Sequence, residues 1–123
     1  MEIKQNNIYT VSEITGRIKK LLEVRFIRVG VVGEISNLRP AASGHIYFSL
    51  KDETSLISAV LFRNDARRVR FELKDGMEVT GWGRIGVYKP RGSYQLIVSR
   101  VEPLGVGALQ LALEQLKAKL SAE

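Results

Sequence analysis

Hydrophobic positions follow two different periods along the chain. Over residues 11–23 they recur with the spacing of an amphipathic helix, at Val11, Ile14, Ile18, Leu21 and Leu22. Thr10 and Glu13 have the spacing of a capping box, so we expect the helix to begin directly after Thr10. From Arg28 onward hydrophobic and polar residues alternate, which predicts strands at 28–38, 44–52, 55–63, 77–89 and 93–102.

The segments between these strands carry turn residues. Asp52 to Ser55 suits a tight hairpin, and Pro90 and Gly92 lie between the fourth and fifth strands. Between the third and fourth strands, Asn64 or Asp65 can cap a short helix. This order predicts a mainly β protein, a five-stranded Greek-key barrel of the OB-fold type, which binds oligonucleotides or oligosaccharides. An SH3-like barrel is the alternative, but it rarely has a helix at this point.

Three regions are expected along the chain. Residues 1–24 hold an N-terminal arm and helix, residues 25–103 form the OB-fold domain, and residues 104–123 form a further helix. Leucines repeat in this last helix with the spacing of a helix–helix seam, at Leu109, Leu113, Leu116 and Leu120. The C-terminal helix is therefore a candidate route of self-association.

Composition and charge narrow the class of partner. The chain has 123 residues, 45% hydrophobic and 26% charged, which suits one globular domain. Its formal net charge is +6, and most of the excess lies between Arg28 and Arg100, so we expect an anionic partner. The absence of cysteine excludes disulfides and thiolate metal sites and favours a reducing compartment, here the cytoplasm. We expect no contact with a membrane, because no apolar run has the length of a span.

Residue types for catalysis are scarce. The sequence has one histidine, no Gly-x-Ser-x-Gly elbow and no Walker loop. No helix is expected after the glycines of "GWGRIG", so a dinucleotide site is excluded. Asp52 and Glu53 could bind Mg²⁺, but adjacent acids in a solvated turn are the common explanation. We expect no catalytic residue, no metal site and no cofactor in this chain.

The outward face of the second predicted strand combines aromatic, basic and hydrogen-bonding groups. On the third strand, the alternation points Ser58, Val60 and Phe62 outward. An OB-fold binds its ligand on this face and in the loops that join strands 1–2 and 4–5. Aromatic and basic side chains in one groove suit single-stranded nucleic acid. The candidate binding residues are Asn37, Arg39, Ser43, His45, Tyr47, Lys51, Phe62, Arg63, Tyr88, Lys89, Arg91 and Tyr94.

Several aromatic residues also have a purely structural interpretation. Tyr47 could cover a seam of the barrel, a one-residue bulge would turn Phe62 into the core, and His45 could form only a local hydrogen bond. Trp82 is expected in the core or against a helix rather than as a stacking surface. Arg91 has no evident packing role in its exposed loop, so it is the best single candidate for a phosphate contact.

Three stretches resemble the amino-terminal domain of the large subunit of bacterial exodeoxyribonuclease VII: "VVGEISNLRPAASGHIYFSLKDE", "YKPRGSYQLIV" and "GALQLALEQLKAKL". The resemblance runs in order from about Tyr9 to the end of the chain. It implies an exonuclease that degrades single-stranded DNA from either end without a divalent metal, and whose large subunit pairs with several small helical subunits. It also implies that a nuclease domain follows the OB-fold domain, so that residues 104–123 would link to a catalytic domain outside this chain.

Under this resemblance the chain is the module that grips single-stranded DNA. Two alternatives remain open from the residues alone. One is an RNA-binding OB-fold similar to the anticodon-binding domain of a synthetase, and the other is a protein-interaction domain. Competition between single-stranded DNA and RNA for binding to the chain would distinguish the RNA-binding alternative from the DNA-binding module. The second predicts oligonucleotide binding only at low salt and without stacking.

Overall fold

The computed structural model describes residues 7–104. In chain order the elements are α1 (Val11–Arg25), β1 (Val29–Pro40), β2 (Ile46–Lys51), β3 (Leu56–Leu61), α2 (Arg63–Ala66), β4 (Glu78–Tyr88), the 3₁₀ turn η2 (Lys89–Arg91) and β5 (Ser93–Pro103). All five predicted strands are present, with ends shifted by no more than two residues. The expected C-terminal helix and its self-association lie outside the described residues.

The strands close into a barrel in the order β1-β2-β3-β5-β4. β1 pairs antiparallel with both β2 and β4, whereas β3 and β5 run parallel. The register between β1 and β2 shifts between Ser36 and Arg39, where Asn37 has a φ of 53°. Such a bulge bends a strand, which helps one strand pair with two neighbours around a closed barrel. This is the strand order of an OB-fold, so the predicted fold is confirmed.

The interior of the barrel follows the predicted alternation, but the outer face follows it only in part. Phe48 and Leu50 are buried inside, and Tyr47 is exposed outside, as expected. The alternation predicts an outward, exposed Val60, yet this residue is 1% exposed although it lies outside the contiguous core. It sits in register between Tyr47 on β2 and Ile97 on β5, so larger side chains on both sides leave it little access to solvent.

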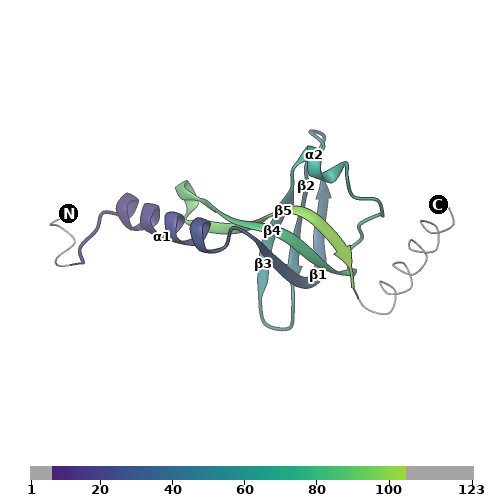
Figure 1. Ribbon diagram of the computed structural model, residues 1–123, viewed down its shortest axis with the longest axis horizontal. Coiled ribbons are helices and arrows are strands. Elements are labelled where there is room, and N and C mark those ends of the chain that lie inside the picture. Colours follow the sequence, from purple (N-terminus) through teal and green to yellow (C-terminus); the bar gives the residue numbers. More distant parts are fainter. Residues whose placement is uncertain (1–6, 105–123) are drawn as a thin grey trace.

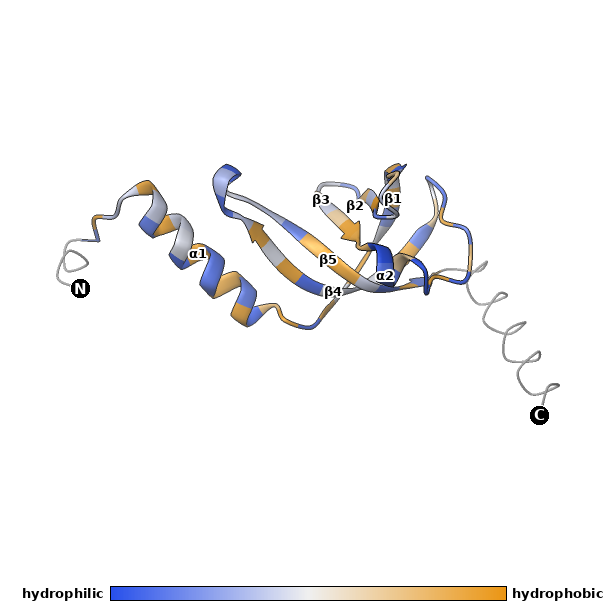
Figure 2. Cartoon of the chain, turned by 90° about the horizontal axis from the view of Figure 1, so that it is seen from above, coloured by the Kyte–Doolittle hydropathy of each residue, from blue (hydrophilic) through white to orange (hydrophobic). Residues whose placement is uncertain are grey.

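Helix α1 begins with the predicted capping box between Thr10 and Glu13. It extends from the barrel alongside the β4–β5 hairpin (Figures 1 and 2). A polar contact fixes it there, because the Glu23 carboxylate accepts hydrogen bonds from Lys19 Nζ at 2.8 Å and from the Val87 backbone N–H at 3.0 Å. These two hydrogen bonds, first that from Lys19, hold the pKa of Glu23 below its ordinary value.

Helix α2 is a single short turn, and its predicted cap is wrong. Its N-cap is Phe62, which offers no side-chain hydrogen bond, and Asn64 and Asp65 both lie inside the helix. The helix starts earlier than expected because the chain turns directly after β3. The first free N–H of α2, that of Arg63, is instead accepted by His45 Nδ1 at 2.9 Å. A ring from the β1–β2 connection therefore replaces the local cap.

Candidate nucleic-acid interface

Five of the predicted residues meet where β2 begins. We call them the Tyr47 cluster: Arg39, His45, Tyr47, Phe62 and Arg63. The guanidinium carbon of Arg39 lies 5.9 Å from the ring centroid of Tyr47, its partner in the β1–β2 register. The ring of His45 makes edge contacts with Tyr47 at 6.4 Å and with Phe62 at 5.3 Å between centroids. Tyr47 is 36% exposed and Phe62 is 40% exposed, so both rings are accessible from solvent.

His45 organises this cluster rather than simply lining it. Because its Nδ1 accepts the Arg63 N–H, the ring has a fixed orientation between Tyr47 and Phe62. Gly44 precedes it with a φ of 97°, and a Cβ there would approach Arg63 Cγ to 2.8 Å. The hydrogen bond from the Arg63 N–H is not the local one expected of His45, because Arg63 lies 18 residues further along the chain. It does not remove the ring from the surface, since His45 remains half-buried between two exposed aromatic residues.

Two further predicted residues, Asn37 and Ser43, lie next to the cluster and influence the backbone conformation there. Asn37 occupies the β1 bulge with a left-handed φ of 53°, a conformation that asparagine tolerates better than most residues. The N–H of His45 approaches Ser43 Oγ at 3.5 Å, the upper limit of a hydrogen bond. Both residues thus shape the β1–β2 connection next to the cluster.

Lys51 lies apart from the cluster, at the opposite end of β2. It shares a shallow depression with acidic side chains of β1, β4 and the β2–β3 turn: Glu34, Asp52, Glu53 and Glu78. The N–H groups of Thr54 and Ser55 donate to the Asp52 carboxylate, and these hydrogen bonds lower its pKa. This end of the face is acidic and therefore less suited to phosphates than the Tyr47 cluster. Among residues 7–104, no group of three or more potential ligands is placed to hold a metal ion.

The remaining candidates lie at the tip of the β4–β5 hairpin, which Figure 1 shows beside α1 and away from α2. Tyr88 and Arg91 are exposed. Lys89 lies against α1, where its Nζ would be 3.6 Å from a Cβ placed on Gly16. Tyr94 lines an apolar pocket with residues of α1, β1 and β4, among them Leu22. The structure therefore divides the predicted residues between the Tyr47 cluster with its flanking residues and the hairpin tip, and it leaves Lys51 apart from both.

A row of paired residues runs around the outside of the barrel from the Tyr47 cluster. Tyr47 pairs with Val60, Val60 with Ile97, and Ile97 with Arg84 on β4. The row ends beside Trp82. The sequence predicts this residue in the core or against a helix, but it is 38% exposed, and among residues 7–104 no helix residue lines the depression around it. Trp82 and Arg84 lie two residues apart on the fourth predicted strand, so their side chains point to the same face. This spacing is the signal in the sequence that could have indicated a second exposed surface with aromatic and basic side chains.

These features define an OB-fold barrel with an exposed aromatic and basic face. Residues 9–102 match the family described as OB-fold nucleic acid binding domain, and the chain belongs to this family.

Among characterised proteins, the chain is similar to exodeoxyribonuclease 7 large subunits. That of a Nitratiruptor species is 54% identical over 93% of this chain and 27% of that protein. That of Halothermothrix orenii is 50% identical over 97% of this chain and 30% of that protein. The chain thus spans less than a third of the length of either relative. The resemblance seen in the sequence is confirmed.

Solved structures share the fold at low sequence identity. Asparaginyl-tRNA synthetase from Pyrococcus horikoshii superposes with a TM-score of 0.54 and 17% identity, over 72% of this chain and 21% of that one. A chain of a replication protein A heterotrimer bound to single-stranded DNA superposes with a TM-score of 0.54 and 15% identity, over 77% of this chain and 73% of that one. No helix within residues 7–104 is long and apolar enough to cross a membrane.

Proposed function

We propose that the Tyr47 cluster binds single-stranded DNA. Tyr47 and Phe62 stack on bases, and Arg39 and Arg63 contact phosphates. The observation that carries this proposal is the position of the Arg39 guanidinium 5.9 Å from the centroid of an exposed tyrosine ring. A ring and a cation held together on an OB-fold face supply stacking and charge at one point, as single strands require.

The electrostatic surroundings of the cluster favour an anionic ligand. Within residues 7–104, neither Arg39 nor Arg63 forms an ion pair with a carboxylate. Their charge is therefore not neutralised and remains available to a phosphate. Arg91 and Tyr88 at the hairpin tip form a second part of the proposed interface, reached by a strand that runs along the barrel.

The chain further serves, in this proposal, as the substrate-gripping module of an exodeoxyribonuclease VII type of large subunit. Residues 25–103 are the binding domain, and residues 104–123 connect it to a nuclease domain beyond residue 123. Small subunits bind other parts of the parent protein. The identity of 50–54% to large subunits that are more than three times as long supports this arrangement.

Titration of fluorescently labelled oligo-dT, followed by anisotropy at several salt concentrations, tests the proposal. We expect binding that weakens as salt rises, because phosphate contacts release counterions. Unlabelled single-stranded DNA should compete better than RNA of the same sequence or than duplex DNA. Stronger competition by RNA would favour an anticodon-binding type of module. Binding seen only at low salt would favour a protein-interaction domain.

A further inference from the structure

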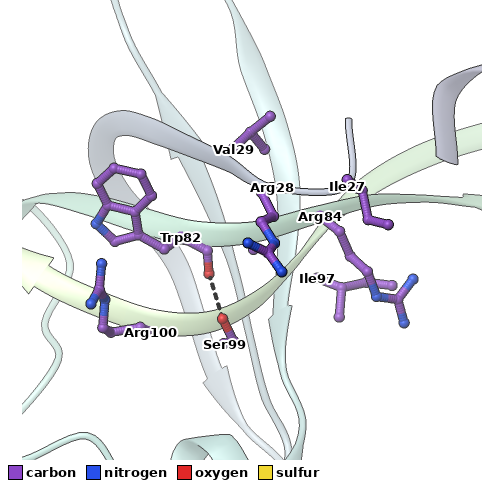
Figure 3. A pocket seen from close by; sticks show the side chains of 9 residues that line it. Ile27, Arg28, Val29, Trp82, Arg84, Ile97, Ser99 and Arg100 are labelled. Atoms are coloured by element: carbon purple, nitrogen blue, oxygen red, sulfur yellow. Dashed lines mark hydrogen bonds between the residues drawn. The ribbon is translucent and has the colours of Figure 1, made fainter. Parts of the chain in front are cut away.

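A second aromatic and basic surface lies on the outside of β4, β5 and the start of β1. We call it the Trp82 pocket and define it by Arg28, Trp82, Arg84, Ile97 and Arg100. It is an open depression of about 420 Å³. Figure 3 shows the Trp82 ring beside Arg100 and the Arg28 side chain between Trp82 and Arg84. The Arg84 guanidinium extends past Ile97, away from Trp82, and its Nη1 is 4.0 Å from the place of a Cβ on Gly86.

The indole of Trp82 is held in a fixed position. Its ring lies over the backbone of β1, so that a Cβ on Gly30 would be 2.6 Å from Cζ3. Its Nε1 donates a hydrogen bond to Glu102 Oε1 at 2.9 Å. The guanidinium carbon of Arg100 lies 5.3 Å from the ring centroid, and Arg100 Nε is 3.8 Å from Glu102 Oε2. A partly exposed ring with these restraints loses little conformational freedom when it stacks on a ligand.

A break in the β4–β5 ladder presents the ring at the surface. Trp82 pairs with Arg100 and Gly83 with Val98, so Ser99 is left over between them. The hydroxyl of Ser99 donates to the Trp82 carbonyl at 3.1 Å. A Cβ on Gly83 would collide with the carbonyl oxygen of Ile97, so only glycine fits at this bulge. Bulges of this kind redirect side chains and are frequent at functional sites.

The charged residues that line the pocket are all basic, although the Glu102 carboxylate borders it through its contacts with Trp82 and Arg100. Arg28, Arg84 and Arg100 line it, and no carboxylate does. Within the described part of the chain, Arg28 and Arg84 form no ion pair. Guanidinium groups beside an exposed indole match a ligand that carries phosphates and flat bases.

Continuity with the Tyr47 cluster identifies the ligand. The row from Tyr47 through Val60 and Ile97 to Arg84 crosses three strand spacings, about 14 Å in total. Both side chains between its ends are apolar. We infer that a single strand bound at the Tyr47 cluster continues across Val60 and Ile97 to the Trp82 pocket. There a base stacks on Trp82 while Arg28 and Arg84 contact phosphates. This inference rests on the proposed function. It adds to the Tyr47 cluster a second site of contact with the nucleic acid, on β4 and β5.

Trp82 is the only tryptophan in the chain, so its fluorescence reports on this pocket alone. The test compares oligo-dT of about 5 and about 15 nucleotides, which span the range bound by one OB-fold. We expect the longer oligonucleotide to quench the tryptophan emission and to shield the indole from acrylamide. The shorter one should bind at the Tyr47 cluster and leave the emission unchanged.

Variants separate the two contacts. Arg28→Ala combined with Arg84→Ala should weaken binding of the longer oligonucleotide only, and should lower the slope of log affinity against log salt by about 1.4, or about 0.7 for each phosphate. Tyr47→Ala should weaken binding of both lengths. Lys20→Ala combined with Arg25→Ala removes the same charge from α1 and should preserve the slope. Thermal melting of each variant checks that it folds.

Two results would overturn the inference and leave the proposed function standing, provided that Tyr47→Ala still weakens binding. One is unchanged tryptophan emission at saturation with the longer oligonucleotide. The other is an unchanged affinity and salt slope in the double arginine variant. If the native chain binds neither oligonucleotide, the proposed function fails and the inference fails with it.

Discussion

The indole of Trp82 lies directly over Gly30, its partner in the β1–β4 register, with 2.6 Å between Cζ3 and the place where a Cβ would be. A glycine in a strand leaves bare backbone, and an aromatic side chain on the neighbouring strand can cover it. The contact explains how a large ring can be 38% exposed and still have a defined position. It ties the start of β1 to the middle of β4.

Gly30→Ala should therefore displace the indole. We expect the free energy of unfolding to fall by about 1–3 kcal/mol, because the added methyl group overpacks the contact, and the tryptophan emission to shift toward that of a more exposed ring. Denaturant unfolding followed by fluorescence measures both. Gly16→Ala is the matched control, since a Cβ there meets only the Lys89 side chain at 3.6 Å and alanine favours a helix. Native stability and emission in Gly30→Ala would contradict the arrangement.

Glu23 should make part of the stability depend on acid pH. Hydrogen bonds from Lys19 and Val87 hold the pKa of Glu23 below its ordinary value of 4.5. A carboxyl whose pKa is lower in the folded state stabilises the fold above its unfolded pKa, and this contribution disappears as pH falls through the folded pKa. Glu23→Gln should reduce stability by about 1 kcal/mol at pH 7, and the difference should shrink below pH 4.5.

Unfolding curves collected from pH 7 to pH 3 would measure this effect. Glu53→Gln, in the exposed β2–β3 turn, controls for the loss of one negative charge. If the free energy of unfolding of Glu23→Gln differed from that of the native protein by the same amount at every pH, the Glu23 contact between α1 and β4 would not make stability depend on pH.

Local patterns were sufficient to predict the fold, because each depends on neighbours in the chain. The alternation around Tyr47 placed its ring outside and Phe48 inside, and both positions are as expected. The capping box at Thr10 depends on three residues of sequence and is also present. An OB-fold follows from the order of such elements.

Contacts between distant segments could not be predicted in this way. The position of Trp82 depends on Gly30 of another strand and on the unpaired Ser99. The start of α2 depends on His45, which is 18 residues before Arg63. The two halves of the candidate interface separate because the β4–β5 hairpin leans on α1 rather than over β2 and β3. The position of the hairpin depends on the hydrogen bond between Glu23 of α1 and the Val87 N–H of β4, which the periodicity of the sequence does not predict.

Arg39→Ala and Arg91→Ala test whether both halves contact phosphates. Each should lower the slope of log affinity for oligo-dT against log salt by about 0.7, the value for one phosphate on a single strand. Arg91 is exposed in η2 and makes no ion pair with a described residue, so its removal should leave the melting temperature unchanged. A reduced slope for Arg39→Ala alone would confine the interface to the Tyr47 cluster.

Tyr47→Ala is the sharpest test of stacking. If the ring stacks on a base, its loss should cost about 1–3 kcal/mol of binding free energy and leave the salt slope nearly unchanged, because no charge is removed. Tyr47→Phe keeps the ring and should retain most of the affinity. Stability and affinity must be measured on the same variants, since Tyr47 also contacts Arg39 and His45. A lower melting temperature with weak binding only near unfolding would indicate a packing role. Native folding with full affinity in Tyr47→Ala would show that this face does not stack bases.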